Sequence, residues 1–273
     1  IVGSVTIFFT SLTVLTMIFP ALFSSTFGQY SENLNSTEIG VYAIPVLLTN
    51  IVLLIFGFFY YRNKLPPGLI SRINTVRSFE ITKKTSLIVL IIIFAIYIGL
   101  STPELFLDES LQWGDYGVLT DALKIWPFGE SENVYVQEQN DRYVRMFLLD
   151  SSLNVFQNIK LLPFFASILL LFVTYLLTVQ ITDKRFAGII ALVVLIHSST
   201  FLKFDTIAVY ENFWVLFYLM SLYVIQKKWI LSPIFYILSF FTKAFVAPYF
   251  IMTLFFVGKS SISKKVKLGL LVS

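Results

Sequence analysis

The segment Thr102-Pro103-Glu104-Leu105-Phe106-Leu107-Asp108-Glu109-Ser110 opens the only long polar interval in the chain, which runs from Thr102 to Lys160. This interval holds ten of the sixteen carboxylates in the sequence, and apolar runs lie on both sides of it. Asp108 and Glu109 stand side by side just after the end of an apolar run. If the runs are membrane spans, this carboxylate pair lies at a membrane surface, where an acid–base site can act on a lipid-borne substrate.

The composition is that of a membrane protein. Hydrophobic residues make up 57% of the chain, charged residues 13%, and the mean hydropathy is +0.81. Soluble domains carry about 25% charged residues. The sequence contains no cysteine and a single histidine, which excludes disulfides and thiolate metal sites and leaves little for a zinc site. We expect neither a metal nor a cofactor.

The apolar runs predict membrane-spanning helices, because a span needs about 20 apolar residues and its backbone groups must bond internally. We interpret the first run as a span rather than a signal peptide, since it lacks a basic start and a cleavage site. The predicted fold class is therefore all-α, a polytopic transmembrane bundle of about 8–9 membrane helices. The candidate runs are Ile1–Phe23, Val41–Tyr61, Thr85–Ser101, Leu161–Ile181, Phe186–Leu202, Ile207–Ile225, Trp229–Val257 and a start near Val266.

The distribution of charge predicts the orientation of these spans. With the 62–84 loop inside and the run Trp229–Val257 crossing twice, the inner loops carry 14 Lys/Arg and 2 Asp/Glu. The outer segments then carry 6 Lys/Arg and 14 Asp/Glu. This agrees with the excess of basic residues in cytoplasmic loops. We therefore expect a multi-pass integral membrane protein with the 62–84 loop in the cytoplasm and the 102–160 loop on the extracytoplasmic or lumenal side.

The run Trp229–Val257 has Lys243 near its middle. As one straight span it would bury an ammonium group at mid-membrane, which costs about 2.5–3.5 kcal/mol or more. Two short helices that meet near Lys243 avoid this cost and satisfy the charge distribution, and Pro248 suits a break just after the meeting point. The alternative is one long tilted helix with a snorkelling lysine.

The sequence also predicts surface helices within the outer loop and a division of the chain into two parts. Within the outer loop, Glu109–Ile125 and Arg142–Phe156 carry apolar residues at helical spacing, which predicts amphipathic helices on the membrane surface. Residues 1–84 form a two-span N-terminal addition with a basic cytoplasmic loop. Residues 85–273 form the transmembrane core, which we expect to be truncated at its C-terminal end.

Several polar residues are predicted to converge on the outer face as a site. Asp108 and Glu109 would be catalytic, and four other side chains would bind substrate: Lys243, Glu211, Asp205 and Tyr210. A carboxylate near an apolar span, such as Glu211, usually faces a cavity or a partner. Simpler interpretations remain open: Asp108 and Glu109 are solvated loop charges, Glu211 caps a helix N-terminus, and Lys203 pairs with Asp205 at the surface.

The order of these pieces resembles the GT-C superfamily of membrane glycosyltransferases, in the branch of the protein O-mannosyltransferases and the aminoarabinose-type lipid A transferases. The likeness covers roughly residues 85–257 and lies in the order of the segments and the topology. It is carried by Leu107-Asp108-Glu109-Ser110-Leu111-Gln112-Trp113-Gly114-Asp115-Tyr116, by Asn158–Pro163 through Thr182–Gly188, by Leu238-Ser239-Phe240-Phe241-Thr242-Lys243-Ala244-Phe245-Val246-Ala247-Pro248, and by Tyr210-Glu211-Asn212-Phe213.

The resemblance implies an enzyme that moves a sugar from a polyprenyl- or dolichyl-phosphate donor to a hydroxyl acceptor, on a protein or a lipid, outside the membrane. It implies that Asp108 is the general base, that Glu109 orients acceptor or donor, and that Lys243 approaches the lipid phosphate. Glu211 would shape the cavity or hold the sugar. The sequence departs from the family at Ala244, where glycine is common, and in its two additional early spans. It has no Asp-x-Asp metal pair in the loops.

A second hypothesis keeps the same scaffold without catalysis. In it the chain is a membrane subunit that serves assembly or lipid binding in a larger complex, with other membrane subunits as partners. The two early spans and the short length favour this alternative. A transporter is disfavoured because no matching pair of broken helices occurs in two halves.

Overall fold

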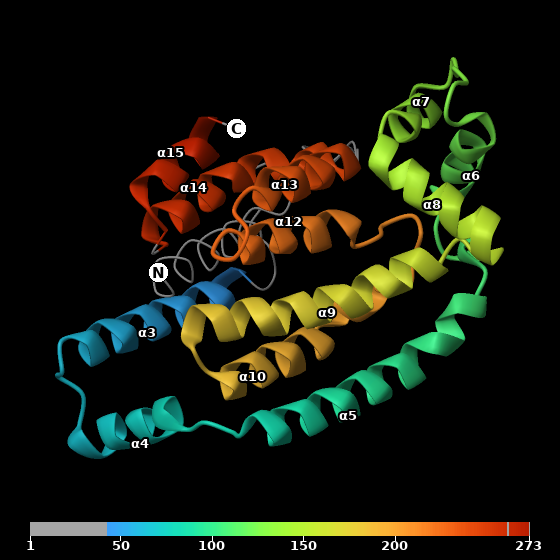
Figure 1. Cartoon of the computed structure of the whole chain (residues 1–273). Coiled ribbons are helices and arrows are strands. Elements are labelled where there is room, and N and C mark those ends of the chain that lie inside the picture. Colours follow the sequence, from blue (N-terminus) through green and yellow to red (C-terminus); the bar gives the residue numbers. More distant parts are fainter. Residues whose placement is uncertain (1–42, 261, 273) are drawn as a thin grey trace. The chain divides into compact units, whose positions relative to one another are not determined.

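The computed structural model describes residues 43–260 and 262–272, and every regular element within them is a helix (Figure 1). The predicted all-α class is therefore confirmed for this part of the chain. The chain divides into two compact units, Ile1–Phe79 and Glu80–Ser273. The predicted span Ile1–Phe23 lies outside the described residues.

The described helices follow one another closely along the chain. Three are short 3₁₀ helices, namely η1, η2 and η3. In chain order the elements are α3 (Ala43–Tyr61), α4 (Pro67–Ser78), α5 (Lys83–Ser101), η1 (Thr102–Phe106), η2 (Glu109–Leu111), α6 (Tyr116–Ile125), α7 (Val134–Asn140), α8 (Tyr143–Phe156), α9 (Leu161–Thr182), α10 (Arg185–Ile196), α11 (Ser199–Phe204), α12 (Phe213–Val224), α13 (Leu231–Thr242), η3 (Ala244–Tyr249), α14 (Phe250–Lys259) and α15 (Lys264–Val272).

The first unit contains α3 and α4. The apolar run Val41–Tyr61 forms α3 as expected, but the basic 62–84 stretch is not only a loop, because α4 occupies its middle. Pro67 stands at the first position of α4, where its missing N–H costs nothing and its fixed backbone angle suits a helix. The Tyr60 hydroxyl donates to Asn74 Oδ1 at 3.1 Å and ties α4 back to the end of α3.

In the second unit α9 packs against α10 and α12, and α5, which runs antiparallel to α9, packs mainly against α10 (Figure 1). At one end Glu80, just before α5, pairs with Arg185 at the start of α10 at 3.4 Å. At the other end Lys160, the N-cap of α9, donates to the carbonyl oxygens of Glu104 and Leu107, beyond the end of α5. Figure 1 shows α10 alongside both helices, and α6, α7 and α8 gathered beyond the N-terminal end of α9.

Two helical stretches among the described residues are long and apolar enough to cross a membrane, Lys83–Phe106 and Leu161–Thr182. The 22 residues of α9 correspond to about 33 Å at 1.5 Å per residue, which matches the roughly 30 Å hydrocarbon core. Other apolar helices are shorter: Leu47–Tyr61, Arg185–Ile196, Phe213–Val224 and Leu231–Thr242. Length and composition thus support two spans, fewer than the eight or nine predicted.

Two of the predicted spans are interrupted. Phe186–Leu202 splits into α10 and α11, and the Ser198 hydroxyl caps α11 by accepting from Phe201 N at 3.3 Å. Ile207–Ile225 is helical only from Phe213, because the peptide groups of residues 208 and 209 bond to side chains from distant segments. Residues 205–212, here the 205–212 loop, therefore remain non-helical between α11 and α12.

The predicted break at Lys243 is confirmed. α13 ends at Thr242, Lys243 is extended with φ −156° and ψ 112°, and η3 and α14 follow. α13 packs against α12 and also contacts α8. The last turn of α13 therefore belongs to the same part of the unit as the outer-loop helices, and the single long helix is ruled out.

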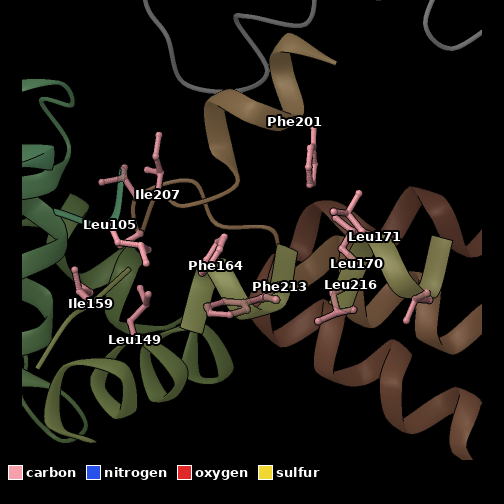
Figure 2. Close-up of a cluster of buried hydrophobic side chains, with 14 of the residues drawn as sticks. Leu105, Leu149, Ile159, Phe164, Leu170, Leu171, Phe201, Ile207, Phe213 and Leu216 are labelled. Atoms are coloured by element: carbon pink, nitrogen blue, oxygen red, sulfur yellow. The ribbon is translucent and has the colours of Figure 1, made fainter. Parts of the chain in front are cut away.

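A continuous apolar core supports the polar loop (Figure 2). Leu105 of η1, Leu149 of α8, Ile159 before α9 and Ile207 of the 205–212 loop contribute buried side chains from separate segments. Burying one such side chain stabilises the fold by about 1.5–3 kcal/mol. This core joins the outer loop to the long helices, so the outer loop packs as part of the second unit.

α5 buries only a narrow stripe of its surface. Its buried residues are Ser86, Leu90, Tyr97 and Ser101, which fall on one side of the helix. The other sides expose large apolar residues, including Leu87, Ile91 and Leu100. The Ser86 and Tyr175 hydroxyls lie 2.7 Å apart and form a buried polar link between α5 and α9.

Replacing Gly188 with alanine is expected to lower the free energy of unfolding by about 1–3 kcal/mol, the cost of overpacking a core. A Cβ at this position would lie 2.7 Å from Tyr175 Cδ2 and 2.8 Å from Val179 Cγ2, because α10 approaches α9 closely here. Gly99→Ala is the matched control, since its Cβ would meet nothing within 4 Å. Thermal unfolding in detergent should rank the two variants in this order; equal midpoints would contradict the packing argument.

Candidate functional site

Asp108 is the exposed member of the carboxylate pair. It is the N-cap of η2, where its Oδ1 accepts from the Ser110 N–H at 2.8 Å. The side chain and backbone N–H of Ser110 lower the pKa of the Asp108 carboxyl, and the positive charge of Lys160 lowers it further. Asp108 is therefore an ionised, accessible carboxylate at neutral pH, with one oxygen fixed by the turn.

Glu109 has the opposite environment, with a relative exposure of 1%. Its carboxylate accepts from Ala208 N at 2.7 Å and Val209 N at 3.3 Å, and Lys160 Nζ lies 3.9 Å away. Burial raises the pKa of Glu109, while the two amides and the charges of Lys160 and Arg145 oppose that rise. Glu109 thus holds the 205–212 loop, and no face of it is open to a substrate.

Arg145 of α8 holds the same loop through its carbonyl groups. The guanidinium donates to Val209 O at 2.8 Å and Ala208 O at 3.2 Å. It also forms an ion pair with Glu211 at 2.8 Å, with both side chains buried, and donates to the Gln139 side chain. The N–H groups of Ala208 and Val209 donate to Glu109, and their C=O groups accept from Arg145. Each backbone polar group of these two residues is therefore hydrogen-bonded.

Lys243 lies within electrostatic range of this ion pair. Its half-buried ammonium interacts with the charges of Glu211, Arg142 and Arg145. Among the described residues its Nζ makes no hydrogen bond or ion pair within normal distances. Since Glu211 is already paired with Arg145 and Arg142 with Glu138, Lys243 is the surplus positive charge at this place.

A cavity of about 480 Å³ opens beside Leu107 and Lys160. Its size falls within the range of small-molecule sites. The lining combines apolar and charged side chains. One of the lining residues, Leu107, directly precedes Asp108 in the chain. The lining residues are Glu104, Leu107, Gln112, Trp113, Lys160, Leu202, Lys203, Thr206 and Ile207.

The structure corrects the assignment of Asp205 to substrate binding. Asp205 is 1% exposed and accepts from Ser101 Oγ at 2.8 Å, and its carbonyl oxygen accepts from Ser167 Oγ at 2.7 Å. Burial raises the pKa of the Asp205 carboxyl. The Tyr97 hydroxyl is near enough to interact with its charge, although no hydrogen bond of normal geometry joins Tyr97 Oη to Asp205 Oδ1. Asp205 anchors the loop from inside.

Tyr210 and Lys203 also differ from their expected roles. The Tyr210 hydroxyl donates to Asp115, and its ring lies edge-on to Trp113 at 5.0 Å between centroids. Lys203 does not pair with Asp205; its ammonium stands over the Trp113 ring at 5.1 Å. Tyr210 therefore supports the wall of the cavity without lining it.

The structure thus assembles two groups of charges, each of which combines predicted site residues with one residue that was not predicted. Asp108 interacts with Lys160, which lines the cavity, and Glu211 interacts with Arg145 and Lys243. The 205–212 loop joins the groups, since Glu109 and Arg145 bond to the same peptides. The interpretation of Glu211 as a helix cap is wrong, because the N-cap of α12 is Asn212 and the Glu211 carboxylate is used by Arg145.

Sequence analysis missed Arg145 and Lys160. Arg145 falls on the apolar face of α8 with Met146, Leu149 and Ser152, all buried, and a cation at a core-facing position is a signal of a buried partner. Lys160 stands directly before the apolar run of α9. By sequence alone it is one more charge of the outer loop, because a lysine at the end of a span ordinarily marks a boundary.

No group of three or more His, Cys, Asp and Glu side chains among residues 43–260 and 262–272 is arranged to hold a metal ion. Comparison with protein-family models, with curated proteins and with solved structures finds no match for this chain.

Proposed function

We propose that this chain is a membrane glycosyltransferase that passes a sugar from a polyprenyl- or dolichyl-phosphate donor to a hydroxyl acceptor, with Asp108 as the general base. One observation carries the proposal: two adjacent carboxylates have opposite environments. Asp108 is exposed and follows Leu107, which lines the cavity, whereas Glu109 is buried and bonded to two backbone amides. A rigidly held neighbour presents an ionised carboxylate at a fixed position, which is what proton abstraction requires.

The reaction balances with the groups at hand. The acceptor hydroxyl oxygen attacks the anomeric carbon of the donor sugar, and the bond from that carbon to the phosphate oxygen breaks. The hydroxyl proton passes to the Asp108 carboxylate, and the lipid phosphate leaves with the bonding electron pair. The acceptor hydroxyl would bind in the cavity lined by Gln112 and Thr206, which Leu107, the residue before Asp108, also lines.

Lys243 suits the charge that develops on the departing phosphate. Its ammonium is half-buried and makes no hydrogen bond within the described residues, while the nearby anion Glu211 is paired with Arg145. A cation in a partly desolvated place stabilises a phosphate oxygen more strongly than one in water. This assigns the donor phosphate to the Lys243 side of the loop and the acceptor to the cavity side.

The apolar surface of α5 supports the membrane part of the proposal. Exposed side chains such as Leu87, Ile91 and Leu100 cover the sides of α5 that do not face α9 and α10. Soluble monomers rarely expose contiguous apolar patches larger than a few hundred Å². In a bilayer these side chains would contact lipid. The multi-pass topology and the extracytoplasmic position of the 102–160 loop belong to the same proposal.

The test is sugar transfer by the full protein in lipid nanodiscs with radiolabelled polyprenyl-phosphate-linked sugars. We expect labelled product and free polyprenyl phosphate in equal amounts, and no transfer from a nucleotide-linked sugar. Lys243→Ala should raise KM for the lipid donor without changing KM for the acceptor.

The non-catalytic scaffold predicts the opposite result. In that case the protein binds the lipid-linked sugars without releasing polyprenyl phosphate from any of them. A panel of donors that is bound but never cleaved would therefore overturn the transferase in favour of a scaffold that holds lipid.

A further inference from the structure

We propose that Lys160 is a positioning residue, which fixes Asp108 by holding the backbone turn between η1 and η2. This inference rests on the proposed function, in which Asp108 is the base. Lys160 is not one of the site residues predicted from the sequence. Its ammonium is nevertheless the group that links the carboxylate pair, the turn and the cavity.

The contacts of Lys160 identify its role. Nζ donates to Leu107 O at 2.6 Å and to Glu104 O at 2.9 Å. Leu107 directly precedes Asp108, so the first of these bonds restrains the peptide that leads into the base. The neighbouring Asn158 side chain donates to Leu105 O at 3.2 Å, a carbonyl that lies in the chain between the two that Lys160 contacts.

Lys160 is also fixed from its other side. Its side chain is 6% exposed, and Nζ lies 3.9 Å from Glu109, which is buried in turn against the 205–212 loop. A buried lysine loses rotamer freedom and solvation, and this cost is offset only by several well-placed partners. The ammonium group thus connects the turn that carries Asp108 to the loop that carries Glu211.

The charge of Lys160 acts on Asp108 as well. Lys160 is among the causes that lower the pKa of the Asp108 carboxyl, after the bonds from Ser110. A carboxyl group whose pKa is lowered stays ionised to lower pH. Removing the positive charge therefore raises the pKa of Asp108, and the acid limb of the rate profile moves to higher pH.

Two variants separate the two effects of Lys160, namely its hydrogen bonds to the turn and its positive charge. Lys160→Met removes both, so we expect kcat to fall about 100-fold, the loss that a misplacement near 1 Å causes, and the acid limb to move upward. Lys160→Arg keeps the charge but not the geometry of the two carbonyl contacts. Its kcat should fall while its acid limb stays where it is in the wild type. Lys124→Met, which removes an exposed lysine of α6, is the control.

Direct titration of Asp108 makes the test independent of turnover. Carbon-13 NMR of the labelled carboxyl should report a higher pKa in Lys160→Met than in Lys160→Arg or wild type, and the Ser110 amide should exchange faster in Lys160→Met. If Lys160→Met leaves Glu109 unbalanced and misfolds, Lys160→Met with Glu109→Gln restores neutrality and is measured instead. An unchanged pKa, exchange rate and kcat would overturn the proposal. Absent transfer in the wild type, with the pKa and exchange changes present, would refute the function and leave Lys160 as the residue that holds Asp108.

Discussion

Replacing Asp108 with asparagine is expected to lower kcat about 10²–10⁴-fold, the contribution of a positioned general base. The amide is nearly isosteric, and its oxygen can still accept the Ser110 N–H that Asp108 accepts at 2.8 Å. It cannot take up the proton of the acceptor hydroxyl. Because Asp108 is exposed and its hydrogen bonds are to its near neighbour Ser110, the thermal unfolding midpoint should stay at the wild-type value.

The rate profile and a control sharpen this experiment. Since Ser110 and Lys160 lower the pKa of Asp108, the wild-type rate should stay level from neutral pH down to mildly acidic pH. It should fall only as the pH drops through the lowered pKa, below the usual aspartate value of about 3.9. Asp121→Asn, in an exposed i,i+3 pair with Lys124, should leave kcat unchanged. Transfer at the wild-type rate by Asp108→Asn would remove Asp108 from the mechanism.

Replacing Arg145 with methionine is expected to lower the free energy of unfolding by about 3–5 kcal/mol, the cost of breaking a buried ion pair by removing one partner. The change removes the cation that is bonded to Glu211, a carboxylate that is 5% exposed in the wild-type structure. It also removes the donors to the carbonyls of Ala208 and Val209. The 205–212 loop would lose the hydrogen bonds that Arg145 makes to Ala208, Val209 and Glu211.

A second substitution, at Glu211, should restore the stability of this variant. Arg145→Met combined with Glu211→Leu removes both buried charges, and replacement of a buried pair by apolar groups is often close to neutral. We therefore expect the double variant to recover most of the lost stability. Arg142→Met is the matched control: Arg142 pairs with Glu138 at 2.6 Å on the surface of the outer-loop helices, and such i,i+4 pairs contribute about 0.3–0.5 kcal/mol.

Chemical denaturation in detergent, followed by tryptophan fluorescence, would rank these three proteins. Trp113 and Trp126 lie in the outer loop and report its unfolding. Similar losses for Arg145→Met and Arg142→Met, or a double variant no more stable than Arg145→Met, would show that the buried pair does not hold the loop.

The sequence by itself determined the local features of the molecule. Apolar runs with few polar interruptions become helices wherever their backbone groups can bond only within the segment, and α3, α5 and α9 follow the predicted runs closely. The break at Lys243 was also readable, because a lysine in a 29-residue apolar run carries a large desolvation cost. The unequal placement of charge along the chain is likewise a property of sequence alone.

Only the tertiary structure decided which carboxylate is exposed and which is buried. Asp108 and Glu109 are adjacent and nearly alike in chemistry, so no local pattern separates them. Glu109 is buried because the amides of Ala208 and Val209, about a hundred residues away, meet its carboxylate. Lys160 and Arg145 acquire their roles in the same way, from partners that only the folded chain brings within reach. The 205–212 loop stays non-helical for that reason, although its sequence continues into the apolar run of α12.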